Sequence, residues 1–421
     1  MDGAQARKAV VAGMIGNVLE WYDFAIYGYF AAAIGRQFFP REDPVAQLLA
    51  AFGVFAVGYL MRPIGGVIGG HIGDRFGRRA ALTFSIVAMA IPTFTIGLLP
   101  GYETLGVTAP ILFTCLRVFQ GLSIGGEFTS SIVFLVERAP EGRRGLWGSF
   151  GPFGASGGIL LGSAVAAGFA AMMSAQALDA WGWRIPFLLG LVVGLAGLLL
   201  RRHMIESAPT ETRERAPIVE TLYDHWRLVV RLATLTAFNA VGFYVSFVYV
   251  ASWLQTADGI PPSRALEINT INMVVLLAVV VVGGWLSDRF GRKPFLLIPA
   301  IIAFVVAAPL FMLMEHPAPL LALLGQFGFA LIVGTYAGVQ APTMAEIVPA
   351  RVRCTAVALG YNSTMGVIGG LTPLAATWLV ARSGDEIAPA FLIMAAAAIS
   401  FLSALGLNET YRKPLDVSIP K

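Results

Sequence analysis

The sequence predicts an all-α membrane protein that crosses the bilayer twelve times and keeps both termini in the cytoplasm. Three observations predict this fold. Hydrophobic residues make up 57% of the 421-residue chain and charged residues only 13%, about half the charged share that is usual in soluble domains. The apolar residues gather in runs that are as long as the ~20 residues a helix needs to cross a bilayer. The basic residues concentrate in every second loop.

Twelve apolar runs are long enough to span a hydrocarbon core of ~30 Å as helices. They lie near 11–35, 46–70, 80–99, 108–136, 146–174, 184–202, 228–256, 265–287, 294–314, 319–347, 354–381 and 388–407. Four prolines inside these runs, Pro92, Pro152, Pro342 and Pro373, mark candidate kinks. A bilayer helix tolerates proline where neighbouring helices satisfy the freed backbone groups.

The distribution of basic residues orients these spans. Of 29 Lys and Arg, 22 fall in the two termini and the even-numbered loops, and five fall in the odd-numbered loops. The positive-inside rule therefore places both termini in the cytoplasm. The two that remain, Arg62 and Arg117, lie inside spans. Because the basic residues are scattered over loops, the net charge of +4 does not indicate nucleic-acid binding.

The chain repeats itself after about 210 residues. GGHIGDRFGRR at 69–79 corresponds to GGWLSDRFGRK at 283–293, and ERAPEGRR at 137–144 corresponds to EIVPARVR at 346–353. Such repeats are typical of transporters built from two related bundles. We therefore predict two six-helix bundles, 1–202 and 227–421, joined by a polar cytoplasmic linker at 203–226.

The doubled G-x-x-x-D-R-x-G-R-R/K segment resembles the loop signature of the major facilitator superfamily. Further motifs along nearly the whole chain resemble its metabolite:proton symporter branch. They include GNVLEWYDFAIYG (16–28), YLMRPIGG (59–66), RVFQGLSIGGEF (117–128), EGRRG (141–145) and WGWRIPF (181–187). The resemblance implies a multi-pass symporter of the bacterial inner membrane, driven by the proton gradient. We expect a monomer in the lipid bilayer without a cofactor or metal.

Two substrate classes remain open. The first half resembles the 2-oxoglutarate and citrate or tricarballylate symporters most, which favours import of a di- or tricarboxylate. It resembles the proline/betaine symporters somewhat less, and the chain ends soon after Tyr411, whereas some osmosensing relatives carry a long coiled-coil tail. The second hypothesis is therefore a zwitterion, whose quaternary ammonium a cage of aromatic faces would select. A membrane enzyme or receptor is a third, which no metal cluster or nucleophile arrangement in the sequence supports.

Ionised side chains inside a span cost roughly 2.5–3.5 kcal/mol at the helix centre and are functional-site candidates. Five occur, all in the first half: Glu20, Asp23, Arg62, Arg117 and Glu127. Glu20 and Asp23 are spaced i, i+3 and share one helix face. We predict that Glu20, Asp23 and Glu127 carry the proton, since burial and mutual repulsion disfavour full ionisation. The alternative is that Glu20 pairs permanently with a basic residue of a neighbouring helix.

Helix 4 offers a guanidinium, an amide and a carboxylate on one face, because Arg117, Gln120 and Glu127 fall within about 80° of arc. The stretch resembles the family's R-x-x-Q-G motif, whose arginine is associated with proton-coupled transport. Arg117 can clamp a substrate carboxylate, or hold Asp23 or Glu127 deprotonated. The alternative is a permanent structural ion pair. Arg62 lies two turns before a cytoplasmic loop and could reach the interface, and a structural role is favoured for it.

The second half contributes neutral polar and aromatic groups, because helices 7–12 lack formal charges in their interiors. Buried amides and phenols need partners and find them in a solute or in a neighbouring helix. Asn239 and Tyr244 belong to this group. The residues that we predict to bind the substrate are Arg117, Gln120, Asn17, Tyr22, Tyr249, Gln340, Tyr361 and Asn362.

The cytoplasmic loops predict a gate. Each D-R-x-G-R segment forms a tight turn in which Gly77 or Gly291 can adopt a left-handed conformation. Asp74 is expected to accept hydrogen bonds from the N-terminus of a facing helix, and Arg78 and Arg144 to pair with Glu137 or with an acid of the opposite half. The alternative is that these loops only orient the chain. The predicted gate residues are Asp74, Arg75, Arg78, Glu137, Arg144, Asp288, Arg292 and Glu346.

Overall fold

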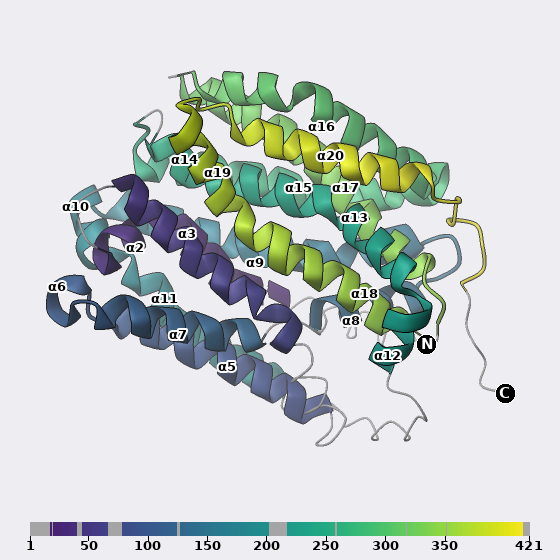
Figure 1. Ribbon diagram of the computed structural model, residues 1–421, viewed down its shortest axis with the longest axis horizontal. Coiled ribbons are helices and arrows are strands. Elements are labelled where there is room, and N and C mark those ends of the chain that lie inside the picture. Colours follow the sequence, from purple (N-terminus) through teal and green to yellow (C-terminus); the bar gives the residue numbers. More distant parts are fainter. Residues whose placement is uncertain are drawn as a thin grey trace.

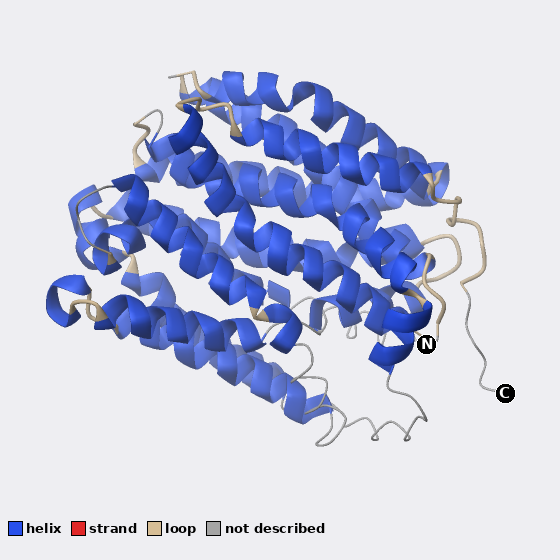
Figure 2. Ribbon diagram, viewed as in Figure 1, coloured by secondary structure: helices blue, strands red, loops and turns tan. Residues whose placement is uncertain are grey.

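The computed structural model describes residues 17–18, 20–39, 44–65, 78–123, 127–201, 217–256, 259–316, 318–350 and 352–415. Every regular element in these ranges is a helix, and the long helices run side by side in one bundle (Figures 1 and 2). Loops gather at the two ends of the bundle. The described part of the chain is therefore all-α, as the sequence predicts.

The helices keep the labels of Figure 1. In the first half of the chain they follow the helical residues 20–29, and they are α2 (Ala31–Phe38), α3 (Pro44–Leu60), α5 (Arg78–Leu98), α6 (Tyr102–Leu105), α7 (Thr108–Ser123), α8 (Glu127–Glu137), α9 (Arg144–Met172), α10 (Ala175–Ala177), η1 (Leu178–Gly182) and α11 (Arg184–Arg201). In the second half they are α12 (Pro217–Asp224), α13 (Trp226–Phe243), η2 (Tyr244–Tyr249), α14 (Val250–Thr256), α15 (Pro262–Phe290), α16 (Arg292–Met314), α17 (Pro319–Glu346), α18 (Arg353–Ser363), η3 (Thr364–Gly369), α19 (Gly370–Ser383) and α20 (Pro389–Leu405).

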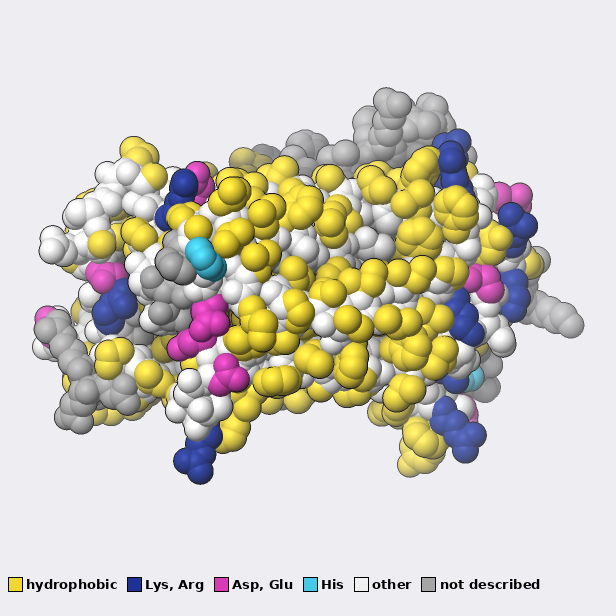
Figure 3. Space-filling model, turned by 90° about the horizontal axis from the view of Figure 1, so that it is seen from above, with side chains coloured by type: hydrophobic (Ala, Val, Ile, Leu, Met, Phe, Trp, Pro, Cys, Tyr) yellow, Lys and Arg dark blue, Asp and Glu magenta, His cyan; other side chains and the backbone are white. Residues whose placement is uncertain are grey.

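Within the described residues, eight helices are long and apolar enough to cross a membrane, and a bent pair at 175–196 makes a ninth. Two shorter apolar helices, Phe84–Leu98 and Pro389–Leu405, lie in two further predicted runs. Figure 3 shows a belt of apolar side chains between two ends that carry the charged ones. This pattern suits a bundle whose middle faces lipid. The count of twelve spans stays a prediction.

Two long helices of the second half contain a π-helical segment at their centre. η2 interrupts the helix formed by α13 and α14, and η3 interrupts the helix formed by α18 and α19. A π-helical turn inserts one extra residue per turn and is frequent at functional sites. Both segments lie beside helices that contact α3, which comes from the first half.

The two halves of the chain meet where α9 lies along α15 and α17, and where α3 lies along α19. Small residues allow the close approach of α9 and α15. A Cβ atom on Gly284 would lie 2.6 Å from the carbonyl oxygen of Gly145 and 2.7 Å from the Cβ of Ser149. α15, which includes Asp288, then ends at Gly291, whose φ of +103° is a positive value that glycine adopts readily.

Candidate functional site

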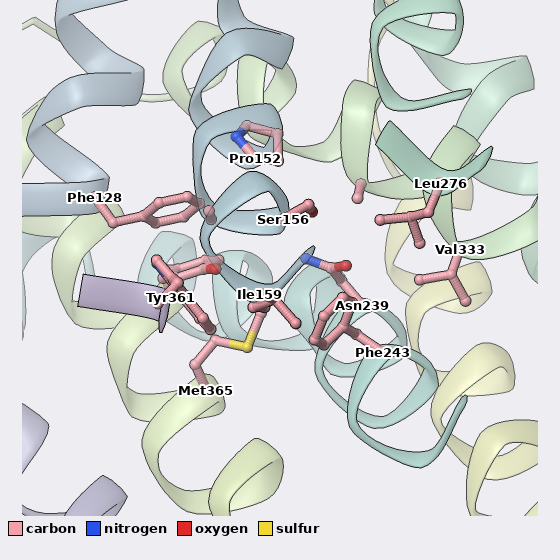
Figure 4. Close-up of a pocket in the computed structure, with 13 residues that line it drawn as sticks. Phe128, Pro152, Ser156, Ile159, Asn239, Phe243, Leu276, Val333, Tyr361 and Met365 are labelled. Atoms are coloured by element: carbon pink, nitrogen blue, oxygen red, sulfur yellow. The ribbon is translucent and has the colours of Figure 1, made fainter. Parts of the chain in front are cut away.

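A cavity lies between helices of the two halves. The first helix, α8 and α9 line it from one half, and α13, α15, α17, α18 and η3 line it from the other. Figure 4 shows Phe128 and Tyr361 on one side of the cavity and Leu276 and Val333 on the opposite side. The lining residues are Trp21, Phe128, Pro152, Ala155, Ser156, Ile159, Asn239, Phe243, Leu276, Val333, Ala337, Tyr361 and Met365.

Aromatic rings dominate one wall of this cavity. The ring of Phe128 lies 4.7 Å from that of Tyr361 and 5.9 Å from that of Trp21, measured between centroids. Phe243 adds a fourth ring from α13. Among the described residues that line the cavity, none carries a formal charge. The cavity therefore offers π faces, which attract cations, in an apolar setting.

An amide chain supplies polarity to the opposite wall. The Asn239 side chain donates to Oε1 of Gln340 at 2.9 Å, and the Gln340 amide donates to the hydroxyl of Thr236 at 2.8 Å. Asn239 and the hydroxyl of Ser156 both line the cavity. Gln340 thus lies behind Asn239 and orients its amide.

The charged residues of the first half form two separate clusters. In the first, Nη1 of Arg117 lies 3.3 Å from Oδ2 of Asp23 and 2.7 Å from Oε1 of Gln120. The Gln120 amide donates to both Asp23 oxygens at 3.0 and 2.9 Å, and the Thr93 hydroxyl also donates to Asp23. These buried side chains come from three helices, the first helix, α5 and α7.

Aromatic rings enclose this first cluster. The Arg117 guanidinium lies 4.3 Å from the centroid of Tyr27, 4.8 Å from that of Phe24 and 5.9 Å from that of Phe55. None of these rings lines the cavity. The structure thus brings the predicted proton and substrate residues Asp23, Arg117 and Gln120 together, but none of the three lines the cavity.

Glu20 and Arg62 form the second cluster. Oε1 of Glu20 lies 3.4 Å from Nη2 of Arg62, and both side chains are buried. The guanidinium stacks 5.2 Å from the Trp21 ring and 5.1 Å from the Tyr59 ring. Arg62 does not reach the membrane interface, because its side chain is only 1% exposed and turns inward to Glu20 and these rings. Glu20 thus pairs with a basic residue of a neighbouring helix, which was the alternative stated for it.

The halves contact each other on both sides of the cavity along α9. Toward one end, the hydroxyls of Ser163 and Thr270 lie 2.7 Å apart, and the Asn269 amide donates to Ser163 at 3.2 Å. Toward the other end, the Asp288 carboxylate accepts hydrogen bonds from the backbone N–H of Gly145 at 2.7 Å and of Leu146 at 2.8 Å. An acid at a helix N-terminus complements the unpaired N–H groups and the helix dipole there.

A salt-bridge network surrounds Asp288. Arg292 binds both oxygens of Glu346, at 2.9 and 3.1 Å, and one oxygen of Asp288 at 2.9 Å. Arg144 of the first half lies 3.4 Å from the same Glu346. Glu137 of α8 lies 2.5 Å from Arg353 of α18. The acidic and basic residues of the two halves thus pair across this end.

The C-terminal residues also contact this network. Glu409 accepts hydrogen bonds from the backbone N–H of Arg292 and of Lys293 at the start of α16. Arg144 donates to the carbonyl groups of Tyr411 and Lys413. Burial raises the pKa of Glu409, but four backbone N–H donors outweigh it and hold the pKa below its usual value.

Of the eight residues predicted to bind substrate, Tyr361 lines the cavity. Asn17 instead donates to Ser131, and the Tyr22 hydroxyl donates to the carbonyl of Pro186 in α11. Tyr249 and Asn362 are buried but do not line the cavity. Arg117, Gln120 and Gln340 do not line it either.

Some residues predicted for the gate and for the proton cannot be placed. Asp74 and Arg75 lie outside the described residues, and the side chains of Arg78 and Glu127 are not described.

A family model described as the Major Facilitator Superfamily matches residues 13–370 and, in a second match, residues 232–418. The chain belongs to this superfamily. It is therefore a transporter and not an enzyme, and a multi-pass protein of the inner membrane. The all-helical bundle is the fold of this family.

Relatives and solved structures agree with this assignment. The glycine betaine/proline/ectoine/pipecolic acid transporter OusA of Dickeya dadantii is 38% identical, over 100% of this chain and 87% of the relative. The proline/betaine transporter of Escherichia coli K12 is 36% identical over the same shares. The proton:xylose symporter XylE bound to 6-bromo-6-deoxy-D-glucose has a similar fold, with a TM-score of 0.77 and 22% identity over 99% of this chain and 98% of that chain.

Sequence reasoning missed the aromatic wall and Arg62. Trp21 and Phe128 lie inside motifs that the sequence displays, but an aromatic residue in a span more often packs between helices, so its type alone gives no signal. Arg62 did carry a signal, since a charge inside a span is a candidate by default. Its nearness to a cytoplasmic loop suggested that the side chain reaches the membrane interface, which the structure does not show.

Proposed function

We propose that the protein is a proton-coupled symporter that imports a zwitterionic osmolyte, such as proline or a betaine, by alternating access. This replaces the di- or tricarboxylate that the sequence favoured. Relatives that are 34–38% identical over the whole chain are named as transporters of proline and betaine, in one case putatively. The names of these relatives do not include a di- or tricarboxylate.

The absence of formal charge from the described residues that line the cavity carries this proposal. A di- or tricarboxylate would lose its hydration and find no lining cation, and burying unpaired charges costs several kcal/mol per ion. A quaternary ammonium instead gains ~2 kcal/mol or more from aromatic faces once it is desolvated. Trp21, Phe128 and Tyr361 supply such faces within one wall.

The proton is assigned to the buried acids of the first half. Asp23 and Glu20 each lie beside one buried arginine, and Glu127 remains a third candidate. Protonation of such an acid weakens its ion pair and lets the surrounding helices move. Because Asp23 does not line the cavity, its effect on the substrate acts through the positions of the first helix, α5 and α7.

The proposal includes a two-bundle transporter that works as a monomer. The bundles are 1–202 and 227–421, with twelve spans, a linker at 203–226 and cytoplasmic termini. Asp288, Arg292, Glu346, Arg144, Glu137 and Arg353 would form the cytoplasmic gate, as their pairing across the two halves supports. The predicted gate residues Asp74, Arg75 and Arg78 belong to the same proposal.

Uptake into proteoliposomes tests this function. Purified full-length protein is reconstituted into vesicles whose interior is either more alkaline (an inward-alkaline gradient) or less alkaline than the outside. Labelled glycine betaine, proline, citrate and 2-oxoglutarate are supplied outside. We expect the zwitterions to accumulate only with an inward-alkaline gradient, and an ionophore that collapses the gradient to abolish accumulation. Gradient-driven accumulation of citrate or 2-oxoglutarate, with no uptake of either zwitterion, would contradict the proposal.

A further inference from the structure

We propose that Arg62 binds the carboxylate of the substrate, and that Glu20 releases Arg62 when it takes up the transported proton. This inference rests on the proposed function and names the anion-binding part of its site. The cavity lining supplies the aromatic part for the cationic end of a zwitterion, but it contains no cation for the anionic end. A buried arginine next to the cavity supplies what the lining lacks.

Arg117 is the less suitable of the two buried arginines. Its guanidinium already contacts Asp23 and Gln120, and Gln120 in turn holds both Asp23 oxygens. Nε and Nη2 of Arg117 have no hydrogen-bond partner, but the guanidinium faces the rings of Tyr27 and Phe24, which do not line the cavity. No described residue of the cavity lining contacts this guanidinium in the way that Trp21 contacts Arg62.

Arg62 has no amide contact like that of Arg117 with Gln120 among the described residues, and it contacts Glu20. Its contact with Glu20 is 3.4 Å long, whereas a charge-assisted N–H···O bond is usually about 2.7–2.9 Å. Nε of Arg62 is buried and has no hydrogen-bond partner. A buried donor without a partner costs free energy, so a second acceptor at this guanidinium would be stabilising.

Trp21 connects Arg62 with the cavity. Its side chain lines the cavity, and the Arg62 guanidinium lies 5.2 Å from the centroid of its ring. Nε1 of Trp21 also has no hydrogen-bond partner, so no hydrogen bond from its N–H fixes the ring. A turn of the Trp21 side chain would connect the cavity with Arg62.

The groups around Glu20 come from several helices. Arg62 and Tyr59 face it from the second span and Tyr361 from α18. The Tyr244 hydroxyl of η2 lies 2.5 Å from that of Tyr59. Asp23 lies one turn along its own helix, and the side chain of Glu127 is not described. Arg62 is the nearest described cation, so loss of the Glu20 charge acts first on this arginine.

The resulting cycle balances charge. Glu20 takes a proton from the outside, loses its negative charge and leaves Arg62, and the substrate carboxylate replaces it there. On the cytoplasmic side the substrate leaves, Glu20 releases its proton to the cytoplasm, and the ion pair forms again. One zwitterion and one proton enter per turn, so one net positive charge crosses the membrane.

Binding of two ligands that differ by a carboxylate tests the role of Arg62. Glycine betaine and choline share the trimethylammonium group, and choline lacks the carboxylate. Titration calorimetry on the purified full-length protein measures both affinities. We expect Arg62→Gln to weaken betaine binding by at least about 30-fold, as is typical for loss of one partner of a buried charge pair. Choline binding should change by less than about 3-fold, and Arg62→Lys should lie between.

Two further variants keep the test decisive. Arg36→Gln removes an arginine that pairs with Asp179 at the surface, 46% exposed, and should leave both affinities unchanged. If Arg62→Gln does not fold, Glu20→Gln/Arg62→Gln leaves no unpaired charge and should show the same loss of preference for betaine. A preserved ratio of betaine to choline affinity in these variants overturns the inference. Failure of the unaltered protein to bind betaine or proline would instead overturn the proposed function.

The pH dependence of betaine binding tests the role of Glu20. In the unaltered protein the affinity should increase as the pH falls, because protonated Glu20 no longer competes for Arg62. Glu20→Gln mimics the protonated state and should bind betaine tightly with a weaker pH dependence. An equally steep pH dependence in Glu20→Gln overturns the proton exchange at this pair.

Discussion

The guanidinium of Arg117 and the carboxylate of Asp23 lie 3.3 Å apart in a buried cluster, and the rings of Phe24 and Tyr27 flank the guanidinium. Neither charged side chain lines the cavity. We expect protonation of Asp23 to act on the cavity by changing how the first helix, α5 and α7 pack. Proton coupling through Asp23 is therefore expected to be conformational.

Asp23→Asn should uncouple transport. The amide keeps the shape of the acid but cannot exchange a proton, so the variant should still exchange labelled for unlabelled betaine. Accumulation driven by a pH gradient should fall to the equilibrium level. Uptake and exchange in proteoliposomes measure the two activities, and concentrative uptake by this variant would contradict the assignment.

Arg117→Ala should destabilise the protein more than Asp23→Asn/Arg117→Gln does. Removing the arginine alone leaves the buried Asp23 without its cation, which typically costs 3–5 kcal/mol. The double variant leaves two neutral amides beside Gln120. Thermal unfolding in detergent compares the two, and equal unfolding temperatures would show that Asp23 is already neutral in the folded protein.

Phe128→Leu should weaken the binding of glycine betaine by about 30-fold, which corresponds to loss of ~2 kcal/mol of cation–π attraction. Phe128→Tyr keeps the ring and serves as the matched control. Titration of both variants with betaine measures the effect. Equal affinities of the leucine and tyrosine variants would show that the aromatic wall does not recognise the ammonium group.

Asp288→Asn should open the end of the bundle at which α9 begins. The substitution replaces a carboxylate that accepts two backbone hydrogen bonds from the opposite half with a neutral amide. Spin labels at the exposed positions Arg143 and Arg289 should then show a larger population at long distances. Asp385→Asn, in an exposed loop at the other end, is the control, and identical distance distributions for Asp288→Asn and the unaltered protein would remove Asp288 from the gate.

Glu409 should stabilise the protein only while it is ionised. Its lowered pKa in the folded state means that it contributes stability above its unfolded value of about 4.5, and that this contribution is lost as the pH falls through the folded pKa. Glu409→Gln should therefore unfold at a lower temperature than the unaltered protein at pH 7. The difference should shrink below about pH 4.5, and a difference that is constant down to pH 3 would refute the assignment.

The fold was more predictable than the site, for a physical reason. Apolar runs and loop charges respond to the bilayer itself, so 57% hydrophobic residues and a doubled loop motif sufficed to indicate an all-helical transporter. The pairing of Asp288 with a helix N-terminus also follows a local rule, although the sequence suggested it for the equivalent Asp74. Such rules need only neighbouring residues and the solvent.

The cavity depends on how helices far apart in the chain rotate against each other. The spacing of Arg117 and Gln120 gives their common face, but it does not say that this face meets Asp23 and a ring of aromatic side chains. In the same way, no local pattern distinguishes Trp21 or Phe128 from a packing residue. Sequence reasoning therefore found the charged residues but could not tell which of them adjoin the cavity.

The central claim is that an uncharged, aromatic cavity selects a zwitterion. Titration of the purified, unaltered protein with glycine betaine and with 2-oxoglutarate under the same conditions tests it most directly. We predict saturable binding of betaine and no measurable binding of 2-oxoglutarate. Saturable binding of 2-oxoglutarate without binding of betaine would contradict the account.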